Sequence, residues 1–344
     1  MMNYKILGDT GVYVSELCLG TMTFGGEGRW EAIGKQTQQE ADDLVKTAVE
    51  AGINFIDTAN VYSSGLSEKI LGQSIKNLGL DRSTLVLATK AYMRMGEGVN
   101  QVGLSKLHLH QSVEDSLKRL GTDHIDLLQI HGDDPITPLE ETLRALDDLV
   151  RSGKVRYIGC CNLAAWRVMK ALGIQQLKNY DPFVSCQHYY SLATRDLERE
   201  LVPLIKDQNL GLLPWSPLAG GFLTGKFRKD ETGPADARRT SFDFPPINQN
   251  KAFEIVEVLD SLSKENGYSI AANSLAWLLH QDPVTSVIIG AKTKKQLQDN
   301  LTATEIKLAS QHLQALDQVS QLEKEYPGWM VEYQATGRVP QVEE

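Results

Sequence analysis

Short apolar runs rich in aliphatic and β-branched residues recur along the chain, and longer segments with helically spaced apolar residues separate them. Runs of the first kind are typical of strands buried on both faces, and segments of the second kind are typical of amphipathic helices. The pattern predicts strands at 16–19, 53–56, 85–89, 125–130, 155–160, 184–187, 211–215 and 286–289. It predicts helices at 39–51, 67–75, 107–120, 139–151, 164–171, 196–207 and 271–280.

Several segments fall outside this alternation. Two apolar runs at 4–7 and 12–14 flank a Gly/Asp turn, which predicts a β-hairpin at the start of the chain. The segments 248–265 and 310–325 have helical spacing, so we expect them to form two extra helices. The segment 217–249 is long and rich in glycine, proline and charge, as functional or disordered loops often are.

About eight strand–helix units in succession favour an α/β fold, the (β/α)8 TIM barrel, with residues 1–344 as a single domain. The hairpin would close the floor of this barrel, and the two extra helices would lie outside the repeat. A doubly wound sheet is the rival architecture. Its Gly-x-Gly-x-x-Gly fingerprint occurs nowhere in the sequence, which disfavours it.

The composition is that of an ordinary globular protein, with 42% hydrophobic and 23% charged residues. A formal net charge of -9 argues against a nucleic-acid partner. The four cysteines form no CxxC pair, which indicates reduced thiols and a cytoplasmic location. No signal peptide is evident, no apolar run approaches the ~18 residues of a membrane span, and no feature assigns an oligomeric state.

Four polar residues follow directly or closely on predicted strands: Asp57, Tyr62, Lys90 and His131. The carboxyl ends of the strands of a TIM barrel meet at one mouth, so these side chains should converge there. An ammonium group beside a phenol favours ionisation of the phenol and makes it a better proton donor. A carboxylate would hold the ammonium in place, and an imidazole would hydrogen-bond the oxygen that receives the proton.

These residues lie in motifs through which the chain resembles the aldo-keto reductases nearly from end to end. The resemblance is greatest to the bacterial, potassium-channel-β-like and aryl-alcohol-dehydrogenase-like branches of the family. The motifs occupy residues 20–25, 52–62, 126–131, 215–218 and 290–293, in the order that the family shows. A set of motifs in the correct order is far more specific than any one of them.

The resemblance implies an NADPH-dependent reduction of aldehydes and ketones by direct hydride transfer from the nicotinamide C4 atom. In this reaction Tyr62 is the general acid, Lys90 paired with Asp57 lowers the pKa of Tyr62, and His131 positions the carbonyl oxygen. No metal is required, because the positive charge around the phenol supplies the electrostatic stabilisation.

The resemblance also implies cofactor contacts at residues at or beyond the strand ends. These are Gly20, Thr21, Met22, Asp57, Cys161, Asn162, Gln187, Trp215, Ser216, Pro217, Leu218, Gly220, Lys226, Arg239, Gly290, Lys292, Gln296, Asp299 and Asn300. Among them, Asn162 and Gln187 would hold the carboxamide and Trp215 would stack on the nicotinamide ring.

Three of these residues carry cations that suit the 2′-phosphate of NADPH: Lys226, Arg239 and Lys292. They favour NADPH over NADH, although a solvated loop position is the alternative for each. Cys161 stands where many relatives carry serine, and Gln296 replaces an arginine position of some NADPH-specific members.

Aromatic residues in the loops and the tail are candidates for the substrate site: Phe24, Trp30, Tyr92 and Trp329. With Met93 they would suit aldehydes that carry apolar or aryl groups. The tail around Trp329 is expected to fold over the mouth as a lid. Loop packing is the alternative for each of these side chains.

Two other functions remain open on the sequence. The first is a cofactor-binding regulatory protein in the manner of potassium-channel β subunits. The second is a metal-dependent hydrolase that uses His131, Asp133 and Asp134.

Two further motifs carry little weight. The segment 220–227 nearly matches a phosphate-binding P-loop, but Phe227 stands where serine or threonine would hold magnesium. His108 and His110 look like a metal-binding pair, yet they lie inside a predicted helix.

Overall fold

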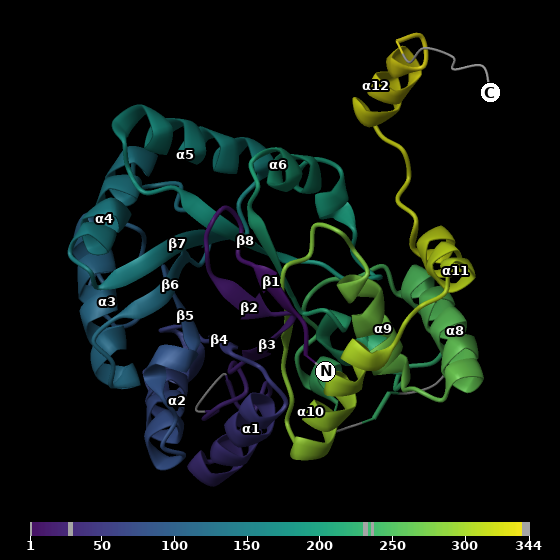
Figure 1. Cartoon of the computed structure of the whole chain (residues 1–344), viewed down its shortest axis with the longest axis horizontal. Coiled ribbons are helices and arrows are strands. Elements are labelled where there is room, and N and C mark those ends of the chain that lie inside the picture. The colour runs from purple at the N-terminus through teal and green to yellow at the C-terminus, as the bar shows by residue number, and fades with distance from the viewer. Residues whose placement is uncertain (1, 27–29, 230–232, 235–236, 339–344) are drawn as a thin grey trace.

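Eight parallel strands form the central sheet of the computed structural model, which describes residues 2–26, 30–229, 233–234 and 237–338. Their spatial order is β10-β3-β4-β5-β6-β7-β8-β9. The bounds are β3 (Leu17–Gly20), β4 (Phe55–Asp57), β5 (Val86–Ala91), β6 (Ile125–Ile130), β7 (Val155–Cys161), β8 (Phe183–Tyr189), β9 (Gly211–Trp215) and β10 (Val287–Ile289). A parallel bridge between Leu212 and Val284 brings the two edges together, so the sheet curls into a barrel (Figure 1).

Helices surround the barrel and follow the strands in turn (Figure 1). They are α1 (Gln38–Glu50), α2 (Leu66–Asn77), α3 (Lys106–Leu120), α4 (Leu139–Arg151), α5 (Ala165–Lys178), α6 (Leu201–Asp207), α9 (Ile270–Leu279) and α10 (Lys294–Leu301). Local chemistry sets their ends. The Ser105 side chain caps the first turn of α3, and Gly121, at φ 66°, ends that helix in the left-handed conformation.

The predicted hairpin plugs the floor of the barrel. Strands β1 (Tyr4–Ile6) and β2 (Tyr13–Ser15) pair antiparallel and lie across the barrel in Figure 1. Leu7 and Val14 are fully buried and pack against inward-facing strand residues such as Phe55. This apolar floor leaves the opposite, carboxyl ends of the strands for polar side chains.

The predicted (β/α)8 barrel with its hairpin is therefore confirmed, with differences at the ends of elements. Of the two extra helices, α8 (Gln249–Asn266) matches its prediction within one residue, whereas α11 (Ser310–Ser320) ends five residues early. The short helices α7 (Arg238–Ser241) and α12 (Gly328–Ala335) were not predicted. Positions 230–232 and 235–236 of the predicted loop and 339–344 of the predicted domain lie outside the described residues.

Two kinds of feature are absent from the described residues. None of their helices is both long enough and apolar enough to cross a membrane. Within the same ranges, no group of three or more His, Cys, Asp or Glu side chains is placed to hold a metal ion.

Candidate active site

The four polar residues that follow predicted strands meet at the carboxyl end of the barrel. Asp57 is the last residue of β4, Lys90 lies near the end of β5, His131 follows β6 directly, and Tyr62 begins a short turn after β4. Asp57, Tyr62 and His131 line a cavity of about 440 Å³. Lys90 is fully buried behind them.

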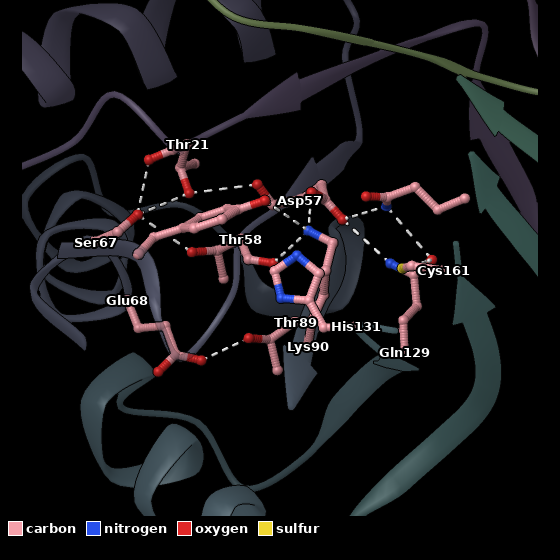
Figure 2. Close-up of polar contacts among 12 residues, drawn as sticks. Thr21, Asp57, Thr58, Ser67, Glu68, Thr89, Lys90, Gln129, His131 and Cys161 are labelled. Carbon is pink, nitrogen blue, oxygen red and sulfur yellow. Dashed lines mark hydrogen bonds and ion pairs between the residues drawn. The ribbon is translucent and has the colours of Figure 1, made fainter. Parts of the chain in front are cut away.

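The Lys90 ammonium connects the group (Figure 2). It forms an ion pair with the Asp57 carboxylate and donates to the Thr58 carbonyl at 2.9 Å. It also lies 3.2 Å from the Tyr62 hydroxyl. An ammonium has three hydrogens, so these three acceptors use all of them. The amine is thereby held in one position against the phenol.

The protonation states follow from burial and from this charge. Burial raises the pKa of Tyr62, and the Lys90 charge acts in the opposite direction without reversing the shift. Lys90 therefore lowers the pKa of Tyr62 as expected, but burial outweighs this effect, so the phenol is not more acidic than usual. Burial also disfavours the charged form of Lys90, but Asp57 and Tyr62 outweigh it and raise the pKa of Lys90. At neutral pH the site thus holds a protonated phenol beside an ammonium.

His131 is neutral at the same pH. Burial, and secondarily the Lys90 charge, hold the pKa of His131 well below its usual range. The imidazole packs edge-on against the Tyr62 ring, with centroids 5.8 Å apart. A neutral imidazole beside the phenol can donate one hydrogen bond into the cavity, which suits it to orient an oxygen atom there.

Two amides and an indole, from Asn162, Gln187 and Trp215, also line this cavity. Asn162 has a left-handed backbone at φ 58°, and its side chain accepts a hydrogen bond from Trp215 Nε1 at 2.9 Å. Its amide nitrogen donates to the His131 carbonyl at 3.3 Å. The Gln187 amide nitrogen donates to Asp57 Oδ1 at 2.9 Å. These partners set which end of each amide is nitrogen and which is oxygen.

A second cavity of about 370 Å³ adjoins the first, and together they form a long groove. Six residues line both: Thr23, Ile33, Ser216, Pro217, Arg238 and Gly290. Such a groove fits an elongated ligand with a ring system at each end, as a dinucleotide has.

Most of the predicted cofactor residues line this groove. The first cavity is lined by Gly20, Met22, Asp57, Asn162, Gln187, Trp215, Ser216, Pro217 and Gly290. The second is lined by Ser216, Pro217, Leu218, Gly220, Lys226, Gly290, Lys292, Gln296, Asp299 and Asn300.

Three predicted cofactor residues line neither cavity. Thr21 and Cys161 are fully buried and hydrogen-bonded within the protein. Arg239 is almost fully buried and donates to the carbonyls of Ala219, at 2.7 Å, and Pro245, at 2.9 Å. The geometry gives these three side chains partners inside the protein.

Of the predicted substrate residues, Trp30 lines the first cavity and packs edge-on against Tyr62 at 5.7 Å between ring centroids. Phe24, Tyr92 and Trp329 do not line it, whereas Met93 does. Trp329 lies on α12, which projects away from the barrel in Figure 1.

Sequence reasoning missed several lining residues in the long segment after β9, above all Arg238, Phe242 and Phe244. Phe244 stacks on Trp215, with ring centroids 5.9 Å apart and an interplanar angle of 11°. Arg238 lines both cavities. The one sequence signal for Arg238 was the Arg-Arg pair at 238–239. It did not indicate which of the two arginine side chains lines the groove.

Comparison with known proteins gives matches over most of the chain. The model of the aldo/keto reductase family matches residues 16–321. An uncharacterized oxidoreductase of Bacillus subtilis is 39% identical over 326 residues, 92% of this chain and 96% of that protein. A putative aryl-alcohol dehydrogenase of Schizosaccharomyces pombe is 35% identical over 337 residues, 92% and 95% of the two chains. A probable voltage-gated potassium channel subunit beta of Arabidopsis thaliana is 35% identical over 311 residues, 89% and 92% of the two chains.

Proposed function

Because the chain belongs to the aldo/keto reductase family and is an oxidoreductase, we propose that it reduces aldehydes and ketones to alcohols with NADPH, with Tyr62 as the general acid. The observation that carries this proposal is the 3.2 Å contact between the Lys90 ammonium and the Tyr62 hydroxyl beside a cavity. A protonated phenol next to a fixed positive charge is suited to deliver a proton to an oxygen that gains electron density.

A bound nicotinamide cofactor supplies the hydride that reduces the carbonyl carbon. The residues of the protein supply the proton. Tyr62 gives up its hydroxyl proton to the substrate oxygen, and Lys90 stabilises the phenolate that remains. His131, which is neutral, donates a hydrogen bond that holds the substrate oxygen near the phenol. Asp57 keeps the Lys90 ammonium charged and in place.

Two amides that line the first cavity fit the carboxamide of such a cofactor. Asn162 uses its oxygen on Trp215 and one amide hydrogen on His131, which leaves its other hydrogen as a donor. Gln187 directs its nitrogen toward Asp57 and leaves its oxygen as an acceptor. One donor and one acceptor are what a primary carboxamide needs.

The preference for NADPH is supported by cations along the second cavity, where Lys226, Arg238 and Lys292 contribute to the lining. Arg238→Leu should weaken NADPH at least ~10-fold while changing NADH affinity much less, because only NADPH carries the 2′-phosphate. Titration of both cofactors by tryptophan fluorescence measures this. The matched control is Arg239→Leu, since Arg239 lines neither cavity. Equal affinity of the unaltered protein for both cofactors would contradict the preference.

Apolar lining supports substrates with apolar or aryl groups. Met22, Trp30, Ile33 and Phe242 line the first cavity together with Tyr62. The Schizosaccharomyces pombe relative is a putative aryl-alcohol dehydrogenase, which agrees with this proposal. The four cysteines are free and buried, which agrees with a cytoplasmic location.

The variant Tyr62→Phe tests the function. It removes the proton donor and keeps the ring that packs against Trp30 and His131. Turnover of an aryl aldehyde, followed at the NADPH absorbance band, should fall at least ~100-fold, the low end for a general acid. Cofactor affinity should stay unchanged. Undiminished turnover in this variant would refute the role of Tyr62.

A second candidate function is regulatory binding of the cofactor, which the likeness to the Arabidopsis channel subunit beta favours. Single-turnover measurement of hydride transfer separates the two functions. We expect transfer to a suitable aldehyde at a typical enzymatic rate of about 1 s⁻¹ or more. Transfer slower than this by several orders of magnitude with every aldehyde and ketone tried would favour the regulatory function.

A further inference from the structure

Gln129 lies beside Asp57 and Cys161 in a cluster of polar side chains enclosed by the barrel (Figure 2). It is fully buried on β6, in register with Lys90 on β5 and Gly159 on β7. A Cβ atom on Gly159 would lie 3.3 Å from Gln129 Cγ and only 2.5 Å from Ser185 Oγ. The glycine therefore leaves the space that the Gln129 side chain needs.

Both ends of the Gln129 amide have partners. Its nitrogen donates to Asp57 Oδ1 at 3.2 Å. Its oxygen accepts from Gln187 Nε2 at 3.4 Å and from the Cys161 thiol at 3.8 Å. A reversed amide would set its oxygen against the Asp57 carboxylate, and two acceptors repel each other. The amide thus has a single favourable orientation.

Gln129 in turn fixes Gln187. The Gln187 nitrogen has two hydrogens, and it lies within hydrogen-bond distance of Asp57 Oδ1, at 2.9 Å, and of Gln129 Oε1, at 3.4 Å. With both hydrogens used inside the barrel, the Gln187 oxygen is left for the cavity that this residue lines. Without Gln129, one hydrogen of Gln187 loses its acceptor, and the amide is held by its bond to Asp57 alone.

We propose that Gln129 is a positioning residue for this active site, although it lines neither cavity. It holds the Gln187 oxygen toward the cavity as an acceptor for the nicotinamide carboxamide. It also holds the Asp57 carboxylate that pairs with Lys90. Cofactor affinity and proton delivery by Tyr62 therefore both depend on a residue that touches neither ligand. The proposal rests on the function proposed above.

The substitution Gln129→Met tests it, because methionine has nearly the same length and volume but forms no comparable hydrogen bonds. Gln175→Met is the matched control. Gln175 is equally buried, on α5, and its side chain bonds to the backbone of Asp181, at 2.9 Å, and Phe183, at 3.3 Å. Both variants lose buried hydrogen bonds, so both should lower the melting temperature by similar amounts.

Only Gln129→Met should change the site. We expect its NADPH dissociation constant, measured by tryptophan fluorescence, to rise at least ~10-fold, and its kcat to fall at least ~10-fold. Gln175→Met should keep both quantities within about twofold of the unaltered protein.

The variant Gln129→Glu adds a second measurement, the pH dependence of turnover. If Gln129 only filled space, this pH dependence would not change. A carboxylate at this position faces the Asp57 carboxylate, so it takes up a proton more readily than usual. Once protonated, it can donate to Asp57 Oδ1 as the amide does. The turnover of Gln129→Glu relative to the unaltered protein should therefore rise several-fold as the pH falls from about 8 to about 6.

The outcomes are distinguishable. If the unaltered protein binds no nicotinamide cofactor, the proposed function fails and this inference fails with it. Suppose instead that the unaltered protein binds NADPH and reduces aldehydes. If Gln129→Met then has the same NADPH dissociation constant and kcat as the unaltered protein, only the inference is overturned. The same holds if Gln175→Met is impaired as strongly as Gln129→Met. A pH-independent activity ratio for Gln129→Glu would also overturn it.

Discussion

Under the proposed function, the buried ion pair of Lys90 with Asp57 serves the chemistry more than the stability of the fold. Both side chains are almost completely removed from water, and taking two charges out of water costs about as much as their attraction returns. Apolar residues of similar volume would stabilise the barrel at least as well. The pair is explained by what it does to Tyr62, which receives the third hydrogen of the ammonium at 3.2 Å.

This view predicts a specific pattern of stabilities. Lys90→Met should lower the free energy of unfolding by about 3–5 kcal/mol, because it leaves the Asp57 carboxylate buried without its partner. The double variant Lys90→Met with Asp57→Asn removes both charges and should recover most of that loss. Turnover should stay at least ~100-fold below the unaltered protein in both. Urea unfolding and NADPH oxidation measure the two quantities. Recovered activity in the double variant would contradict the role of the ammonium.

Single residues also show the limit of prediction from sequence. Asp57, Tyr62, Lys90 and His131 were found because the apolar run before each one marks the end of a strand, and strand ends meet at one mouth. Arg238 was not predicted as a site residue, because it lies beside Arg239 in the short helix α7. Neighbouring side chains on a helix point about 100° apart. Which of the two guanidinium groups reaches the groove thus depends on how α7 packs, and the sequence does not encode this locally.

Among the elements, the hairpin depends on a very close contact with the barrel wall. Gly8 has a left-handed backbone at φ +58°, and a Cβ atom there would lie 2.1 Å from the Val184 carbonyl oxygen. Gly79 has nearly the same backbone, at φ +59°, but a Cβ atom there meets nothing within 4 Å. The two glycines therefore separate backbone strain from steric exclusion.

Alanine at each position tests the fit of the hairpin. Gly79→Ala should cost about 1 kcal/mol of unfolding free energy, the penalty of the left-handed conformation alone. Gly8→Ala adds a clash with the β8 backbone and should cost at least ~3 kcal/mol. Chemical denaturation of both variants measures the difference. Equal costs would mean that the hairpin shifts freely and does not plug the barrel tightly.

The elements that could be predicted are those with a strong apolar period. Each of the eight strands lies within two residues of its expected start, because a run buried on both faces leaves little choice of position. The helix α12 had no such signal. Its apolar residues Trp329, Met330, Val331 and Tyr333 do not recur on one face, and none of its described residues is buried. A period appears in a sequence only where one face packs on a core.

At the scale of the whole molecule, the barrel encloses two histidines in their neutral form. Burial lowers the pKa of His188 on β8 to about 4, even though its ring bonds to the Leu163 carbonyl at 2.9 Å. Burial, together with Lys90, also holds the pKa of His131 well below its usual range. An unfolded chain has ordinary histidines with a pKa of about 6.5. In mild acid the unfolded chain therefore binds protons at these histidines, whereas the folded molecule does not.

This difference makes the fold sensitive to mild acid, with a sign that follows from proton binding. Above about pH 6.5 the histidines are neutral in both states and the folded state keeps its full stability. As the pH falls from about 6.5 toward about 4, the unfolded state gains protons and stability is lost. His188 alone should account for about 2–3 kcal/mol at about pH 4.5. In His188→Gln, which keeps a donor for the Leu163 carbonyl, the loss between pH 7 and about pH 4.5 should shrink by that amount in urea unfolding. A loss of the same size in both chains would mean that His188 takes up its proton without unfolding, and an NMR titration of its ring would then show an ordinary pKa.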